Sequence, residues 1–290
     1  MTDKTQAAEQ EFLADYDPYA FPPVAVTADV VALTIRSNEL CVLLVRRARP
    51  PYEGSWALPG GFLSARRPGE PTNTPLETID EAAARALAAK TGLTMSADTQ
   101  AVSAHNAASR VYLEQLRTYG DQARDPRMTV VSVAYVALAP SLPKPTAGHG
   151  TTDARWVPIA ELEIDREEGR VISQNATAYP LAFDHAQIIA DGVERARAKL
   201  EYSPLAAAFV GEEFSIADLR HVYEIVWGEP LHPSNFARKV LSTPGFVEGT
   251  GTFSAEAGTF GGPRAKLYRT GDCALLHPPI LRAASERKIR

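Results

Sequence analysis

The chain has 290 residues, 45% of them hydrophobic, and a formal net charge of −5. These values fit one large or two medium globular domains, and the acidic balance argues against a protein that coats nucleic acid over its whole surface. We expect a cytoplasmic location, because the sequence shows neither an apolar targeting segment nor a run long enough to span a membrane. The two cysteines, Cys41 and Cys273, each sit in an apolar run and are expected to be buried free thiols.

The first part of the chain predicts a short lead-in and a β-hairpin. Residues 1–20 form the lead-in, and the polar residues 1–10 are expected to lack regular structure. The β-branched run Val24–Ile35 and the apolar run Leu40–Arg47 predict two antiparallel strands, because Ser37-Asn38 between them is a tight-turn signal.

Arg47 ends the second of these strands, and Trp56 follows nearby in the sequence. A guanidinium can pair with a phosphate through two hydrogen bonds, and an indole can stack on a base. The two side chains are therefore candidates for holding an anionic ligand that contains a base. The alternative is an ordinary strand end in contact with solvent.

A Gly-rich turn and a well-marked helix occupy Leu58–Leu93. Thr74 is predicted as the N-cap, Pro75 as the first helical residue and Glu77 as the third, which together make a capping box. Gly92 follows the last predicted turn, at a position where a left-handed residue usually ends a helix.

This stretch resembles the Nudix box, whose glutamates hold Mg²⁺ against a pyrophosphate. Aligned on Gly92-Leu93, Arg85 matches the motif arginine, Glu77 the first glutamate and, across a longer loop, Gly61 the opening glycine. The three remaining acidic positions share one helix face and are here Ala86, Ala89 and Lys90. A hard cation finds no oxygen ligands on such a face, so the resemblance implies a Nudix fold with no metal site and no catalytic residues. We interpret Glu77 as a helix cap and Arg85 as one partner of an ion pair that holds the loop.

The following segments predict further strands of the same domain. Val111–Leu116 is expected to be one strand, and the strongly apolar Met128–Leu138 another that is buried on both faces. The charged segment Tyr119–Arg127 is expected to form the turn between them. A short strand over Ala154–Val157 follows, and the polar Glu161–Thr177 has the composition of a surface insertion.

A long helix over His185–Leu200 is expected to end the first domain, which we place at residues 21–203. Asp184 is predicted to cap this helix, and His185 to donate a hydrogen bond in the cap region, with ligand contact as the alternative for His185. The helix is expected either to connect two domains or to form a dimer face.

Residues 204–290 predict a second domain with a helix, a short turn, a second helix and a β-hairpin. Ser215 and Asp218 form a capping box, and Gly228 ends the first helix. The second helix and two strands are expected at Pro233–Ser242, Gly245–Phe253 and Arg264–Tyr268. This order of elements is that of a winged helix-turn-helix.

The second helix carries a polar stripe suited to reading DNA. Asn235, Arg238 and Lys239 share one helix face, and asparagine can read adenine, arginine can read guanine and lysine can bind phosphate. Arg264 and Lys266 lie beside the hairpin loop, where a wing would contact phosphates. The alternatives are a solvated helix face or a module that binds another protein.

A degenerate Nudix domain followed by a winged helix resembles the Nudix-related transcriptional regulators of NAD metabolism. The resemblance is carried by Tyr16–Pro18, Trp56–Phe62, Ala182–His185, Phe214–Leu219 and Gly262–Tyr268. It implies an α/β Nudix-type mixed sheet sandwiched by helices, followed by an α+β winged helix-turn-helix domain. It also implies a dimeric repressor that binds a palindromic double-stranded operator and senses ADP-ribose or a related NAD metabolite, an effector rather than a cofactor.

The same resemblance implies that Arg47, Trp56, Gly61 and Phe62 line the ligand pocket, and Lys90 is added because its charge can take the place of Mg²⁺ beside a diphosphate. It implies DNA contacts by Asn235, Arg238, Lys239, Arg264 and Lys266. An alternative function is a Nudix ADP-ribose pyrophosphatase with unorthodox metal ligands and a C-terminal oligomerisation module. A scaffold that binds proteins, and neither DNA nor nucleotide, is a third.

Overall fold

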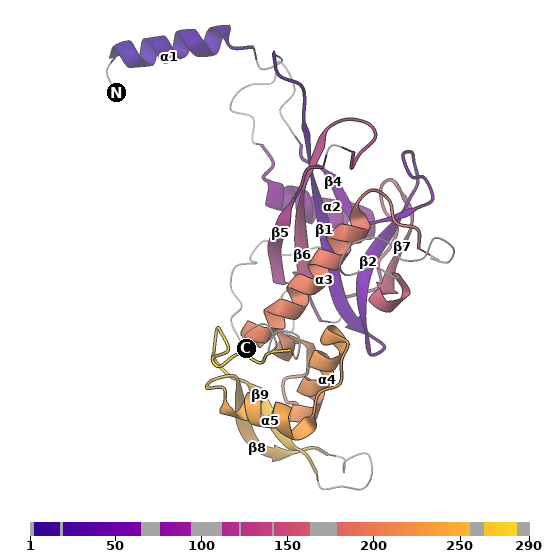
Figure 1. The fold of residues 1–290 in the computed structure, drawn as a ribbon, viewed down its shortest axis with the longest axis vertical. Helices are drawn as coiled ribbons and strands as arrows, with labels where there is room; N and C mark the ends of the chain where they lie inside the picture. Colours follow the sequence, from indigo (N-terminus) through magenta and orange to yellow (C-terminus); the bar gives the residue numbers. More distant parts are fainter. Residues whose placement is uncertain are drawn as a thin grey trace.

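The computed structural model describes residues 3–17, 20–64, 76–93, 112–121, 123–140, 142–162, 179–255 and 264–282 (Figure 1). The helices and strands follow one another in the order α1 (Asp3–Asp15), β1 (Ala25–Arg36), β2 (Glu39–Arg47), β3 (Trp56–Ala57), β4 (Gly60–Phe62), α2 (Ile79–Thr91), β5 (Tyr112–Tyr119), β6 (Val130–Leu138), β7 (Thr151–Pro158), η3 (Ile159–Leu162), α3 (His185–Tyr202), η4 (Pro204–Phe209), α4 (Ile216–Trp227), α5 (Pro233–Ser242), β8 (Val247–Phe253) and β9 (Lys266–Thr270).

The first domain is a mixed sheet of strand order β3–β2–β1–β6–β5, to which β4 adds beside β1 and β7 beside β2. β1 runs parallel to β6, and the other pairs are antiparallel. Helix α2 packs on one face and α3 on the other (Figure 1), so that β1 is buried on both sides and reads as a nearly continuous apolar run. The predicted sheet sandwiched by helices is confirmed.

The β1–β2 hairpin closes through a turn whose two central residues, Ser37 and Asn38, both have positive φ values of 49° and 62°. Such a turn matches the twist of the two strands, and asparagine tolerates this conformation well. The predicted hairpin is therefore confirmed at its turn.

Helix α2 begins four residues later than the sequence analysis predicted. Thr78 is the N-cap, and its side chain forms a capping box with Glu81. Glu77 precedes this N-cap, and its carboxylate is bound elsewhere, because Arg85 binds both of its oxygens and the Ser64 N–H donates to one of them. The interpretation of Glu77 as a helix cap was wrong, whereas the ion pair of Arg85 and the C-cap at Gly92 are confirmed. The predicted cap Thr74 and Pro75 lie outside the described residues.

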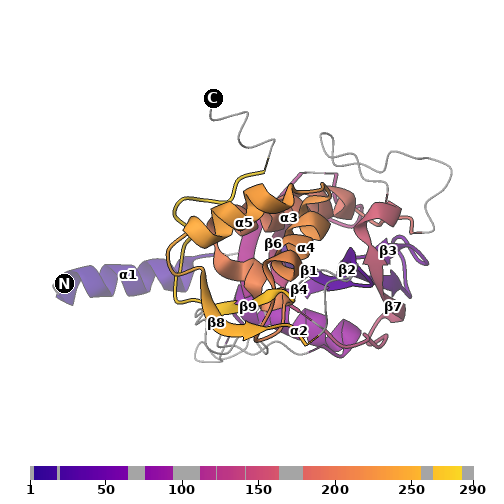
Figure 2. The same ribbon diagram turned by 90° about the horizontal axis from the view of Figure 1, so that it is seen from below.

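The N-terminal segment also differs from the expectation of no regular structure. Helix α1 covers Asp3–Asp15, a run rich in alanine, glutamate and glutamine, which are good helix formers. The helix projects away from the rest of the chain in both views (Figures 1 and 2), and Phe12 and Leu13 are exposed on it.

The C-terminal elements form the predicted winged helix. Ser215 and Asp218 form the capping box of α4, Gly228 ends that helix in the left-handed conformation, and α5 occupies the predicted residues. Phe236 of α5 packs edge-on against Tyr223 of α4 with ring centroids 5.1 Å apart. The two strands of the wing, β8 and β9, each begin two residues later than predicted.

Helix α3 joins the two domains. Its sheet-facing side packs on β1 and β6, and its last turns pack against α4 (Figure 2). At this junction the Trp227 indole donates a hydrogen bond to the Arg197 carbonyl, the Arg197 guanidinium donates to the Val226 carbonyl, and the Tyr223 hydroxyl donates to the Leu200 carbonyl. The main hydrophobic core therefore runs without interruption from the sheet into the winged helix.

Candidate ligand cavity and DNA interface

A cavity of about 270 Å³ opens where the ends of β1, β2 and β4 meet the last turn of α2 and the first turn of α3. Thr27 and Asp29 on β1 and Val45 and Arg47 on β2 are spaced two residues apart, so each pair projects from one face of the sheet. The volume lies near the lower end of the range for small-molecule sites, roughly 300–1,000 Å³. A cavity of this size is too small to enclose the whole of a dinucleotide-sized ligand.

The cavity is strongly cationic. Its described wall carries five cationic side chains against two carboxylates, and those groups are Arg47, Arg49, Lys90, Arg124, Arg127, Asp29 and Asp125. Some of this charge is already neutralised, because Arg127 pairs with Asp125 at 2.6 Å. An anion is the ligand class that such a wall attracts.

Arg124 organises the floor of the cavity. Its guanidinium donates two hydrogen bonds, 2.9 and 2.8 Å long, to the carboxylate of Asp184. It also lies 3.9 Å from Asp29, and only 4% of its side chain is exposed. Asp184 does stand at the N-cap position of α3, but its side chain makes no cap hydrogen bond. The predicted capping role of that carboxylate was therefore wrong, because Arg124 binds it.

His185 is buried beside the same carboxylates and does not play the predicted role of donor in the helix cap. Its Nδ1 atom accepts a hydrogen bond of 2.9 Å from the Leu58 N–H, and its Nε2 atom lies 3.9 Å from Asp29. Burial lowers the pKa of His185, and the nearby Asp29 and Asp184 oppose that effect. The ring is thus a neutral imidazole that fixes the backbone of the Gly-rich turn.

Aromatic rings stack with the cations at the mouth of the cavity. The Arg47 guanidinium lies 4.8 Å from the ring centroid of Phe183, and that of Arg127 lies 5.2 Å from the ring of Phe62. Phe183 has a φ of 55°, which is unusual for a bulky residue and marks backbone strain next to the site. Such a surface offers both a positive charge and flat rings to a nucleotide.

Four of the five predicted pocket residues line this cavity: Arg47, Gly61, Phe62 and Lys90. Trp56 lies outside it and is 5% exposed, packed in the main core against Tyr179. The reason is register, because Trp56 pairs with Arg46 and therefore shares the face opposite to that of Arg47. Sequence reasoning missed Asp29, Arg124 and Arg127. The cluster of charges in the turn before β6 was the local signal for Arg124 and Arg127, and Asp29 on β1 had none.

The described residues do not fit the Mg²⁺ of a Nudix hydrolase. Ala86, at the first of the three missing acidic positions, is buried. A Cβ built on Gly61 would lie 3.4 Å from the Ala86 Cβ, so a methyl group packed against backbone takes the place of a ligand carboxylate. Glu77 is engaged by Arg85, which lowers its pKa to about 2. In the described part of the chain, no three histidine, cysteine, aspartate or glutamate side chains are grouped to hold a metal.

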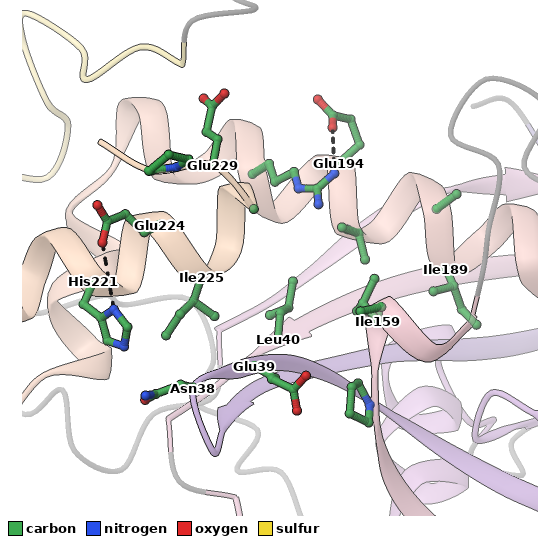
Figure 3. A pocket seen from close by; sticks show the side chains of 17 residues that line it. Asn38, Glu39, Leu40, Ile159, Ile189, Glu194, His221, Glu224, Ile225 and Glu229 are labelled. Carbon is green, nitrogen blue, oxygen red and sulfur yellow. Dashed lines mark ion pairs between the residues drawn. The ribbon is translucent and has the colours of Figure 1, made fainter. Parts of the chain in front are cut away.

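A larger cavity of about 840 Å³ lies between the domains, bounded by the β1–β2 turn, η3, α3 and α4 (Figure 3). Leu40, Ile189 and Ile225 point into it, and carboxylates such as those of Glu39 and Glu229 stand along its rim. Carboxylates repel an anionic ligand, so this cavity is the wrong one for a nucleotide despite its size.

The winged helix presents its predicted DNA residues on its surface. Asn235 and Arg238 of α5 are exposed and lie within 3.5 Å of each other, and Lys239 is half-buried. Arg264 and Lys266 are exposed at the start of β9, on the wing. Phe236 and Val240 anchor the opposite face of α5 in the core, so the polar stripe is held outward.

Comparison with known proteins identifies the family. Residues 24–178, more than half of the chain, match the family model of the NUDIX domain. The chain belongs to the Nudix family. Residues 206–270 match the model described as the NrtR DNA-binding winged helix domain. Together the two matches confirm that this Nudix protein is a Nudix-related transcriptional regulator of NAD metabolism.

Individual relatives of this Nudix regulator agree. It is 28% identical over 265 residues to the ADPR responsive transcriptional repressor NtrR of Acinetobacter baylyi, covering 91% of this chain and 88% of that protein. The crystal structure of Shewanella oneidensis NrtR complexed with a 27mer DNA is 29% identical, with 85% of this chain and 94% of that chain covered and a TM-score of 0.58. An ADP-ribose pyrophosphatase of Methanocaldococcus jannaschii is 27% identical over 181 residues, covering 62% of this chain and 78% of that protein.

The part of the Nudix regulator that the structure describes contains no helix with the length and apolarity needed to cross a membrane.

Proposed function

We propose that this protein is a repressor that binds a palindromic double-stranded operator as a homodimer and releases it when the Nudix domain binds ADP-ribose or a related NAD metabolite. One observation carries the proposal: α3 starts in the cationic cavity, at His185, and ends in hydrogen bonds with the winged helix. A ligand that moves the first turn of α3 thereby acts on the DNA-binding domain through one rigid element.

The charge of each site supports this assignment. The cavity excess of cations suits the diphosphate of ADP-ribose, and the aromatic rings beside it suit a base. The exposed stripe of α5 suits a major groove, and the wing residues Arg264 and Lys266 suit phosphates. The relative from Acinetobacter baylyi is described as responsive to ADPR, that is, ADP-ribose.

The test is a titration of ADP-ribose, without metal, into the complex of the protein with a palindromic DNA element from upstream of its own operon or of NAD-salvage genes. We expect ADP-ribose to weaken operator binding by about five- to 150-fold, the usual range of allosteric coupling. Unchanged DNA affinity at saturating ADP-ribose, AMP and NAD would refute the sensor role.

In this proposal the Nudix domain is not a catalyst, and the protein acts in the cytoplasm, where operator DNA lies. The alanines and the lysine at positions 86, 89 and 90 support this reading against the pyrophosphatase alternative. Incubation of the purified protein with ADP-ribose and Mg²⁺ separates the two. Turnover well above the buffer rate that disappears in Glu77→Gln would establish the enzyme instead.

A further inference from the structure

Resting on the proposed function, we propose that the cavity binds the diphosphate group of its ligand without any divalent cation, and that Lys90 and Arg47 supply the positive charge. The chemical class of the ligand is thus a metal-free diphosphate ester. Binding of the diphosphate is measured apart from any effect on DNA, so failure of this binding can be told apart from failure of the proposed regulation.

The backbone at Lys90 is held in place by hydrogen bonds from the loop before β7. Lys90 lies in the last turn of α2, and the backbone N–H groups of Gly148 and His149 donate to the carbonyls of Lys90 and Ala89. This contact requires a glycine, because a Cβ on Gly148 would lie 2.1 Å from the Ala89 carbonyl oxygen. The loop before β7 is therefore held tightly against the helix end, and the Lys90 ammonium is placed beside Gly150 in the cavity wall.

Lys90 also lacks a close negative partner. Among the described residues, no carboxylate lies within ion-pair distance of its ammonium and no acceptor within hydrogen-bond distance. Asp29 acts on the Lys90 ammonium only from beyond that distance, where it raises the pKa of Lys90, and it accepts hydrogen bonds from Ser132 and Thr27. An uncompensated cation in a partly dehydrated wall costs free energy, which an anionic ligand removes.

Arg47 completes the arrangement from β2. Its Nε donates to the Pro51 carbonyl at 2.8 Å, and its guanidinium stacks on Phe183, so its orientation is fixed before the ligand arrives. The pKa of Lys90 is lowered first by burial and then by Arg47, and that of Arg47 is lowered first by burial and then by Arg127. Burial and a neighbouring guanidinium thus disfavour the charged form of both Lys90 and Arg47, and a diphosphate bound beside them would favour it.

The experiment measures binding of ADP-ribose and of inorganic pyrophosphate to the full-length protein by calorimetry, once in EDTA and once in Mg²⁺. The variants are Lys90→Met, which removes the charge and keeps the length, Lys90→Arg, which keeps the charge, and Lys90→Glu, which reverses it. Lys144→Met is the matched control, because Lys144 is exposed in the adjoining loop and does not line the cavity.

We expect ADP-ribose to bind the wild type equally well in EDTA and in Mg²⁺, and pyrophosphate to bind in EDTA, where no Mg²⁺ competes for its oxygens. Lys90→Met should weaken both by about tenfold or more, as for the loss of a hydrogen bond to a charged group. Lys90→Arg and Lys144→Met should retain most of the affinity, and Lys90→Glu should lose it. Thermal melting should show Lys90→Met to be as stable as the wild type or more so, since burial and Arg47 disfavour the charge of the lysine more than Asp29 favours it.

Two results would overturn the proposal: a requirement for Mg²⁺ in the wild type, or unchanged binding of pyrophosphate and ADP-ribose by Lys90→Met in EDTA. Pyrophosphate binding that needs Lys90 but no metal, together with no binding of ADP-ribose, would support the diphosphate site and refute the proposed effector. Binding of neither compound would refute both.

Discussion

Arg124 in the turn before β6 holds Asp184 at the start of α3 through two nearly parallel hydrogen bonds of 2.9 and 2.8 Å. The two residues are 60 positions apart in the sequence. Their contact therefore ties a surface turn, the cavity and the connecting helix into one unit.

Removing Arg124 should destabilise the protein markedly. Arg124→Ala leaves Asp184 and the buried Asp29 without their cationic partner, which costs on the order of 3 kcal/mol when a buried pair is broken. The control is Arg117→Ala, whose exposed ion pair with Asp191 is worth about 1 kcal/mol or less. Urea denaturation measures both, and equal losses would show that Arg124 is not structurally special.

The neutral state of His185 predicts a dependence of stability on pH. The pKa of His185 is lowered in the folded protein by burial, whereas in the unfolded chain it is about 6.5. Below that pH the unfolded state takes up the proton first, so the free energy of unfolding falls as the pH falls from 7 towards 5. Urea denaturation at several pH values should show a smaller fall in His185→Gln, whose amide oxygen can still accept from the Leu58 N–H. The same fall in both proteins would contradict the assignment.

The polar stripe of α5 predicts two different losses of DNA binding. Arg238→Ala should weaken operator binding about tenfold or more and relax the sequence preference, because a base-reading pair is worth ~1–3 kcal/mol. Lys266→Ala should weaken all sequences about equally and flatten the salt dependence of binding. Fluorescence anisotropy at several salt concentrations distinguishes the two. Arg195→Ala, which removes a positive charge from α3 instead, should bind DNA like the wild type.

The hydrogen bonds between α3 and α4 predict a route for coupling. Tyr223→Phe combined with Trp227→Phe removes the hydroxyl and the indole N–H that bind the α3 carbonyls. The variant should bind ADP-ribose alone and operator DNA alone as the wild type does. The factor by which each ligand lowers the affinity for the other should fall towards one. Tyr135→Phe is the control, because its hydroxyl binds Asp80 on the other side of the sheet. A wild-type coupling factor in the double variant would exclude this junction as the route.

The local signals in the sequence predicted the fold well. The capping box of Ser215, the left-handed Gly92 and Gly228, and the limits of α5 all follow from interactions within a few residues. The start of α2 was missed because Thr74-x-x-Glu77 and Thr78-x-x-Glu81 show the same pattern, and only the distant Arg85 and Ser64 decide between them.

The site was harder to predict, because its residues come from separate segments. Nothing local indicates that Arg124 meets Asp184 or that His185 meets Leu58. Trp56 was assigned to the pocket from its nearness to Arg47 in sequence. Pairing with Arg46 turns it to the opposite face of the sheet. The sequence did indicate Lys90 as a cavity residue. It occupies an acidic position of the Nudix box, and the spacing of that motif sets which face of the helix the position lies on.

The length of α3 gives it the properties of a lever. Its 18 residues span about 27 Å at ~1.5 Å per residue. A tilt of about 5° at the cavity end carries the other end about 2 Å, similar to the ~1–2 Å helix shifts that switch subunit interfaces. In a two-fold dimer, opposed shifts of the two winged helices would add to about 4 Å, which is comparable with one base-pair step of ~3.4 Å. By this geometry, a small movement beside Phe183 on ligand binding would misplace the recognition helices by about one base pair relative to the DNA.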